Sequence, residues 1–90
     1  MVRAYSEVLI ATDIIYSKTK KGIQCAVVVA EDFQREGKAK PNKYEVFFYG
    51  KMADEVNSRL TVGAKFTFRG MVANEDDETR LVGMTLATIA

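Results

Sequence analysis

The alternation of apolar and polar positions predicts two strands and a helix in the middle of the chain. Five of the six residues from Tyr44 to Tyr49 are aromatic or β-branched, which is typical of a strand. Gly50 interrupts this pattern, and from Lys51 to Leu60 the apolar residues recur at helical spacing. Strict alternation returns from Thr61 to Gly70. The middle of the chain is therefore predicted to be a strand, a short helix and a second strand.

Three further strands are predicted, two before this unit and one after it. Ser6 to Tyr16 is apolar and β-branched, and we expect a bend or bulge at its polar centre, from Ala11 to Asp13. Ile23 to Ala30 is apolar on both faces, which indicates a central strand of a sheet. The last strand begins at Arg80. Five strands with one short helix between the third and the fourth predict an all-β fold, a small Greek-key barrel of the OB type.

The polar connections between these strands hold many of the basic residues. Ser17 to Gly22 contains three lysines and predicts a turn, whose charge is either available to a ligand or merely solvated. Glu31 to Lys43 is a polar loop that contains Pro41, and loops of this length are often functional or mobile. Glu75 to Glu78 predicts an acidic turn before the last strand.

Length and charge limit the possible functions. Ninety residues predict one domain, residues 1–90, with a small core. The formal net charge is +1, so a nucleic acid would have to be attracted by local clusters of basic residues. Cys25 is the only cysteine and lies in an apolar strand, where we expect a buried, inert thiol, with a reactive thiol as the alternative.

The residue types argue against catalysis. The chain has no histidine and one cysteine, so the usual metal-ligand clusters and nucleophile–base pairs are missing. We expect no enzyme activity, no metal and no cofactor, and chemistry by carboxylates is the alternative. No apolar run is long enough to cross a bilayer and no signal-peptide pattern is present. We expect a cytoplasmic protein of a bacterial host cell, with association with the nucleoid included, and no membrane partner.

The segment from Tyr44 to Val72, YEVFFYGKMADEVNSRLTVGAKFTFRGMV, resembles the bacterial and phage single-stranded DNA-binding protein (SSB) family. The resemblance runs from about Glu7 to Ile89 and depends on the spacing of Gly50, Lys51, Ala53, Gly63 and Gly70. It implies sequence-independent binding of single-stranded DNA in replication, recombination or repair, with RNA as an open alternative. Cellular members carry a disordered tail with an acidic tip, and this chain ends at the last strand. It therefore resembles a tail-less phage, plasmid or satellite relative, or the tail-less primosomal branch.

The resemblance also implies which residues contact DNA. Aromatic residues would stack on bases, and basic residues on loops that an OB fold places together would contact phosphates. By strand parity Tyr49 shares a face with Lys43 and Phe48 points into the core, although core packing is the alternative for every aromatic residue of this strand. For each basic residue the alternative is a solvated surface role. The candidate nucleic-acid-binding residues are Phe33, Phe47, Tyr49, Lys18, Lys20, Lys21, Arg35, Lys38, Lys40, Lys43, Lys51 and Arg69.

Two further expectations concern protein partners. The first strand is too apolar to remain an exposed edge, so we expect a homodimer or a homotetramer. The alternative function is an OB-fold protein-interaction or primosome-type accessory module with weak nucleic-acid binding. A net charge of +1 is low for a nucleic-acid binder, and the acidic turn could dock a basic partner.

Overall fold

Six strands and one helix make up the fold in the computed structural model, which describes residues 2–32, 42–75 and 78–89. The elements are β1 (Val2–Tyr5), β2 (Leu9–Lys18), β3 (Gln24–Asp32), β4 (Lys43–Tyr49), α1 (Lys51–Arg59), β5 (Lys65–Glu75) and β6 (Glu78–Ile89). No helix formed by the described residues combines the length and the hydropathy needed to cross a membrane.

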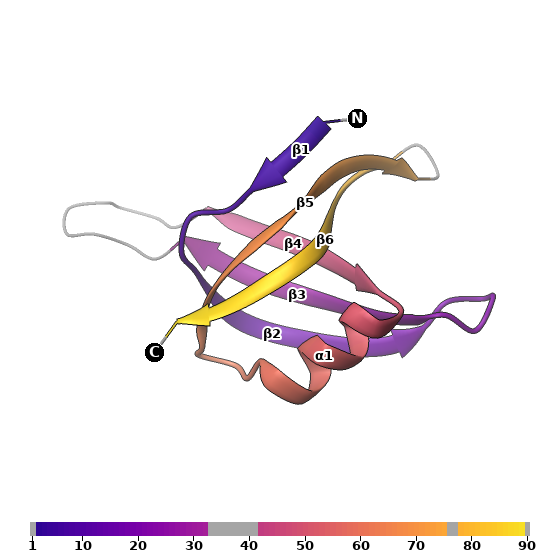
Figure 1. The fold of residues 1–90 in the computed structure, drawn as a ribbon, viewed down its shortest axis with the longest axis horizontal. Coiled ribbons are helices and arrows are strands. Elements are labelled where there is room, and N and C mark those ends of the chain that lie inside the picture. Colours follow the sequence, from indigo (N-terminus) through magenta and orange to yellow (C-terminus); the bar gives the residue numbers. More distant parts are fainter. Residues whose placement is uncertain (1, 33–41, 76–77, 90) are drawn as a thin grey trace.

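Five of the described strands form a closed sheet, and β1 is added to it at one side (Figure 1). The strand order is β1-β5-β2-β3-β4-β6, and a further pairing between β5 and β6 closes the circle. β4 and β6 run parallel, and the remaining pairs are antiparallel. β3 lies between β2 and β4, which confirms the prediction of a central strand.

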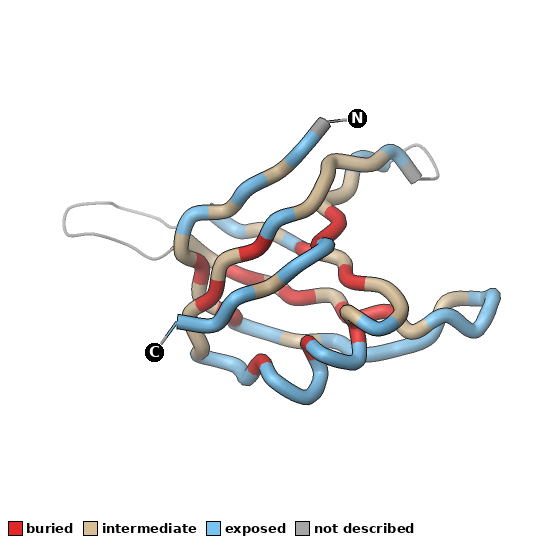
Figure 2. Tube along the Cα trace, viewed as in Figure 1, coloured by how far each residue is buried: buried red, intermediate tan, exposed pale blue. Residues whose placement is uncertain are grey.

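The core fills the inside of this closed sheet (Figure 2). Alternate residues of β3 and β4 point inward, and Val28, Val46 and Phe48 are fully buried. The helix α1 packs against β3 and β4 and contributes Ala53 and Val56 to the same core. A helix with an apolar stripe thereby covers part of the sheet whose inner face is apolar.

Most of the predicted elements are confirmed, with small differences at their ends. The bend expected at Ala11 to Asp13 is a register shift between β2 and β3 at those residues. The predicted helix is α1, and Gly50 precedes it with a φ of 62°, a conformation that favours glycine. Cys25 is buried, as expected. The long loop predicted after β3 lies mostly outside the described residues.

The structure differs from the predictions at β1 and at the start of β5. β1 has four residues and pairs with β5, which lies far away in the sequence, so no local sequence pattern predicts this strand. Strand pairing in β5 begins at Lys65 and not at Thr61, because the N–H of Ala64 donates to the carbonyl oxygen of Thr61 (3.0 Å) in a turn. The positive φ of Gly63, 92°, belongs to the same turn.

Candidate nucleic-acid interface

β4 presents its two faces to different surroundings. Val46 and Phe48 point into the core, where both are fully buried. Phe47 and Tyr49 point to the opposite face and are half-buried. The burial pattern confirms the predicted strand parity, with Phe48 in the core and Tyr49 on the side of Lys43.

The outward side chains of β2, β3 and β4 build a surface that we call the aromatic face, made of Ile15, Val27, Phe47 and Tyr49. The rings of Phe47 and Tyr49 are stacked along the strand, with centroids 6.4 Å apart and an interplanar angle of 22°. Val27 pairs with Phe47 on one side and with Ile15 on the other, so three apolar side chains lie in a row across the three strands. Ile15 is 50% exposed, which is unusual for an isoleucine and gives this face an accessible apolar border.

Arg80 on β6 also belongs to this surface, although it is not among the candidate residues predicted from the sequence. Its guanidinium carbon lies 4.7 Å from the centroid of the Phe47 ring, and its Nη2 atom lies 3.3 Å from Glu78 Oε2. The parallel pairing of β4 with β6 brings Arg80 there. That pairing joins segments distant in the sequence, so no local sequence pattern could have indicated the contact.

Four of the candidate lysines lie at the Tyr49 end of the strands that form the aromatic face. Of these, Lys18 has the parity of Tyr16, so it points to the opposite face of the sheet from Ile15. Lys18 is the last residue of β2, and Lys20 and Lys21 lie in the turn that joins β2 to β3. The N–H of Gly50 donates to the carbonyl oxygen of Gln24 (2.9 Å), which ties the start of α1, with Lys51, to the same turn. All four lysine side chains are exposed. We call Lys18, Lys20, Lys21 and Lys51 the basic end.

A second contact holds this end of β2 against the helix. The hydroxyl of Tyr16 donates a hydrogen bond to Asp54 of α1, and Gln24 Nε2 reaches the other carboxylate oxygen of Asp54 at 3.5 Å. The hydrogen bond to Asp54, followed by desolvation and by the carboxylate charge, raises the pKa of Tyr16 above 10.0. Asp54 is therefore engaged on the β2 and β3 side, which fixes the position of the helix relative to the basic end.

Lys43 lies at the other end of the same face. It pairs with Glu31, whereas Lys18 pairs with Gln24, and these two partners are seven residues apart along β3, about 23 Å. A row made of Asp13, Val29 and Glu45 crosses the strands between Lys43 and the aromatic face. The expectation that the basic residues cluster is therefore wrong for Lys43, because the ends of a long strand place the two groups far apart.

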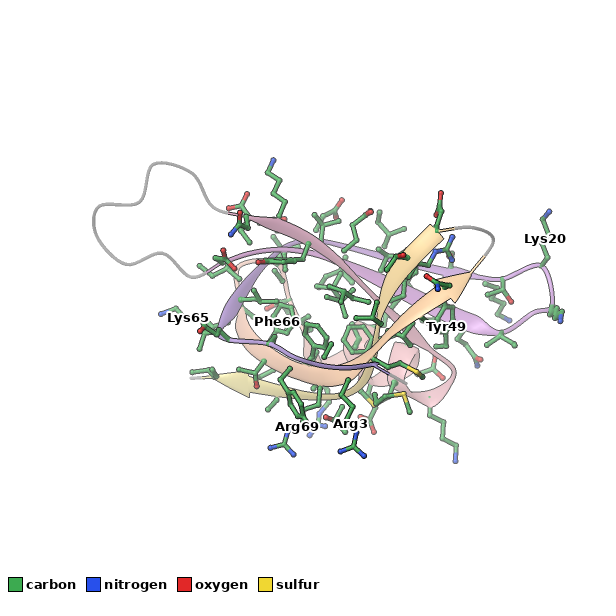
Figure 3. All side chains as sticks on the ribbon, turned by 90° about the horizontal axis from the view of Figure 1, so that it is seen from above. Arg3, Lys20, Tyr49, Lys65, Phe66 and Arg69 are labelled. Carbon is green, nitrogen blue, oxygen red and sulfur yellow. The ribbon has the colours of Figure 1, made fainter. Side chains whose placement is uncertain are left out.

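Arg69 is also separate from the basic end. It lies on β5, and its guanidinium carbon is 5.8 Å from the ring centroid of Tyr5 on β1. Figure 3 shows Arg69 beside Arg3 on one side of the molecule, away from Lys20. The structure thus does not bring Arg69 to the other candidates. Phe33, Arg35, Lys38 and Lys40 lie outside the described residues.

A further cavity lies elsewhere and has different chemistry. It measures about 440 Å³ and is lined by residues of all six strands, among them Asp32 of β3, and by Glu7 between β1 and β2. Within it, Asn42 Nδ2 donates to Asp32 Oδ2 (2.9 Å). The pKa of Tyr44 is raised above its ordinary value of 10.0, first by desolvation and then by the charge of Asp32. Its lining holds two carboxylates and no cationic residue, so this cavity does not suit a phosphate.

Among the described residues, no group of three histidine, cysteine or acidic residues could hold a metal ion.

Comparison with known proteins gives matches in structure only. The fold matches the SSB domain of a protein from Synechococcus sp. with a TM-score of 0.75 and 14% sequence identity, over 96% of this chain and 93% of that one. The chain has the fold of an SSB domain. No protein-family model and no curated protein sequence matches the chain.

Two structures of PriB from Ralstonia solanacearum also match the fold. One has a TM-score of 0.72 at 18% identity and covers 99% of each chain. The other has a TM-score of 0.73 at 16% identity and covers 98% of this chain and 97% of that one. At these identities the likeness concerns the fold, and the roles of individual residues must be argued from the chain itself.

Proposed function

We propose that this chain binds single-stranded DNA without sequence preference and acts in replication, recombination or repair. The observation that carries the proposal is the stacked pair of Phe47 and Tyr49, with four exposed lysines at the same end of the strands. In this proposal β2 to β6 form the five-stranded Greek-key barrel of an OB fold, which binds oligonucleotides on the strands and loops that correspond to β3 and β4 here. The likeness in fold to an SSB domain and to PriB supports the same role.

In this proposal aromatic rings contact the bases and lysines contact the phosphates. A base stacked on the ring of Tyr49 or Phe47 is worth about 1–3 kcal/mol, and every base has a face that can stack. Lysines of the basic end contact phosphates, which are the same in every nucleotide. Neither contact distinguishes one base from another, so binding is general for single strands. Phe33, Arg35, Lys38 and Lys40 remain candidates on the resemblance alone.

The proposal is one of binding and not of catalysis, in the bacterial cytoplasm, on single-stranded DNA or RNA. The whole chain serves as one domain. Duplex DNA hides its bases within the stack, so neither Phe47 nor Tyr49 can reach them there. A preference for single strands is therefore the property that follows most directly from the aromatic face.

We also propose that the chain forms a homodimer or homotetramer through β2. β5 pairs with β2 only at Leu9 and Ile10, and from Thr12 to Lys18 no described residue pairs with that edge. An unpaired edge invites pairing with another chain, and a second copy can supply an identical edge. The 50% exposure of Ile15 on the same strand adds apolar surface to the contact.

A direct titration tests the proposed function. Purified protein is added to a fluorescently labelled oligo-dT and, separately, to a duplex of the same length, and binding is followed by anisotropy at several salt concentrations. The proposal predicts tighter binding to the single strand and an affinity that falls as salt rises, because cations return to the phosphates when the lysines leave. Equal affinity for both forms would contradict it.

A protein-interaction or primosome-type accessory module is the second candidate. Asp13, Glu31 and Glu45 lie on the outer face of the same three strands, and carboxylates there oppose a phosphate backbone and favour a basic protein surface. The titration also separates the two candidates. A weak response to oligo-dT that does not depend on salt would favour the protein partner.

A further inference from the structure

A groove of about 380 Å³ lies next to the aromatic face and shares Tyr49 with it. Its lining includes Met52 of α1, Met71 of β5 and Met84 of β6 together with Val82, and no charged residue. Met84 is 55% exposed, so the groove is open to large ligands on this side. Thioether side chains are polarisable and adaptable, and they make favourable contacts with aromatic rings.

The far side of this groove leads to Arg69 and to two residues of β1 that are not among the sequence candidates, Arg3 and Tyr5. Met71 pairs directly with Arg3 of β1, and the neighbouring pair joins Tyr5 to Arg69. Residues paired in this way point to the same face of the sheet, so Arg3, Tyr5, Arg69 and Met71 share one surface. Figure 3 shows Arg3 and Arg69 side by side on that surface.

The chemistry of this cluster suits a single-stranded nucleic acid. Arg69 lies 5.8 Å from the centre of the Tyr5 ring, and Tyr5 is 65% exposed, so the ring offers an accessible face beside a cation. β1 contains no acidic residue, and those of β5 and β6 are confined to the last pair of the two strands, Glu75 with Glu78. The outer face of β2, β3 and β4, in contrast, carries Asp13, Glu31 and Glu45.

We propose that single-stranded DNA continues from Tyr49 across the methionine groove to Arg3, Tyr5 and Arg69. This inference rests on the proposed function and extends it to a second surface of the molecule. Bases lie against the methionines and the Tyr5 ring, and the two arginines contact phosphates. Continuity argues for DNA as the occupant, because the ring of Tyr49 lines the groove and belongs to the aromatic face.

Oligonucleotides of two lengths separate the second surface from the first. An oligo-dT of about eight nucleotides fits the aromatic face, whereas one of about 20 exceeds the 4–16 nucleotides that one OB fold usually covers. The salt dependence of binding, as log K against log salt, should be steeper for the longer oligonucleotide by about 1.4, because each added phosphate contact contributes about 0.7. The Arg3→Gln/Arg69→Gln variant should lose this difference and bind the longer oligonucleotide about 3- to 30-fold more weakly, as expected for two surface charge contacts.

Two further variants control for charge and test the groove. Arg59→Gln removes one exposed charge on α1, where Arg59 Nη1 lies 3.9 Å from Glu55, and should affect both lengths alike. Met84→Glu places a carboxylate in the groove at an exposed position, so it should weaken binding of the longer oligonucleotide only. In spectra of protein with labelled methionine methyl groups, the signals of Met71 and Met84 should shift with the longer oligonucleotide and not with the shorter one.

The outcomes distinguish failure of this inference from failure of the proposed function. If the wild-type protein binds neither length, the proposed function itself is wrong. If both lengths bind with the same salt dependence and the methionine signals do not move, the aromatic face stands and the second surface is wrong. A change in molecular mass in the double arginine variant would identify this surface as a contact between protein chains and would also overturn the inference.

Discussion

The ring of Phe48 occupies the space that a Cβ atom on Gly83 would need. An added Cβ at position 83 would lie 2.1 Å from Cε2 of Phe48, much closer than any allowed contact. Phe48 is fully buried, so its ring cannot move away without displacing other core residues. The close approach of β6 to β4 thus depends on a glycine in one strand and an aromatic ring in the other.

Gly83→Ala should therefore destabilise the fold by roughly 1–3 kcal/mol, the range for overpacking a core. Urea unfolding followed by circular dichroism measures the change. A double variant, Gly83→Ala with Phe48→Leu, is the control, because the smaller leucine makes room for the added methyl group. If the double variant loses as much as the two single changes added together, the proposed contact between these residues is not the cause.

The lysines of the basic end should contribute more to DNA binding than Lys43 does. Changing Lys20 and Lys21 to glutamine should make the salt dependence of oligo-dT binding shallower by about 1.4, since each lost phosphate contact contributes about 0.7. Lys43→Gln should change it little, because the row of Asp13, Val29 and Glu45 separates Lys43 from the aromatic face. A larger effect at Lys43 than at the two turn lysines would place the DNA path at the opposite end of the strands.

The hydrogen bond from Tyr16 to Asp54 should make stability depend on alkaline pH. Because the folded state raises the pKa of Tyr16 above its ordinary value, the unfolded chain loses this proton first as pH rises. The contribution is therefore fully present below about pH 10 and is lost as pH rises through the folded-state pKa. From about pH 10 up to the folded-state pKa, the free energy of unfolding should therefore fall more steeply for the wild type than for Tyr16→Phe.

Urea unfolding of both proteins between about pH 8 and pH 11 measures the difference. Tyr44 is present in both proteins, so its own raised pKa cancels in the comparison. At the lower end of this range Tyr16→Phe should be the less stable protein. Parallel pH profiles for the two proteins would show that the contact with Asp54 does not influence folding.

The open edge of β2 predicts self-association. Light scattering should give a mass of two or four times the 10.0 kDa of one chain. The melting temperature should rise with protein concentration, since association stabilises the folded chain by mass action. A mass of one chain at every concentration, with a constant melting temperature, would contradict the proposed role of this edge.

The local elements could be predicted from the sequence because each leaves a local pattern. Alternation assigned Phe48 and Tyr49 to opposite faces of β4, and a two-residue period is a property of the strand itself. The helix after Gly50 was predicted for the same reason, since its apolar residues recur within a few positions. β1 could not be predicted in this way. Four residues are too few to show a clear alternation, and the strand that β1 pairs with, β5, follows much later in the chain.

The arrangement of the candidate site depended on pairings that no local pattern encodes. Arg80 reaches Phe47 only because β6 runs parallel to β4 there. The loops of the predicted barrel group Lys43 with the other basic residues, but the length of β3 separates it from the basic end. Arg3 and Tyr5 could not be found without β1.

The central claim is that the outward rings of β4 bind bases, and oligo-dT affinity in three single variants tests it most directly. Tyr49→Ala should lose about 1–3 kcal/mol of binding, or about 5- to 160-fold in affinity, and Phe47→Ala should lose affinity in the same direction. Glu45 lies on the same strand and the same face. Glu45→Ala should leave the affinity unchanged or raise it, because the change removes a carboxylate near the path of the DNA. Phe48→Ala should instead cost about 3–5 kcal/mol of stability in urea unfolding, as truncation of a buried aromatic side chain does, so unfolding and affinity measured on each variant separate folding from binding. If the folded Tyr49→Ala and Phe47→Ala proteins bind oligo-dT as tightly as the wild type, the aromatic face does not bind DNA.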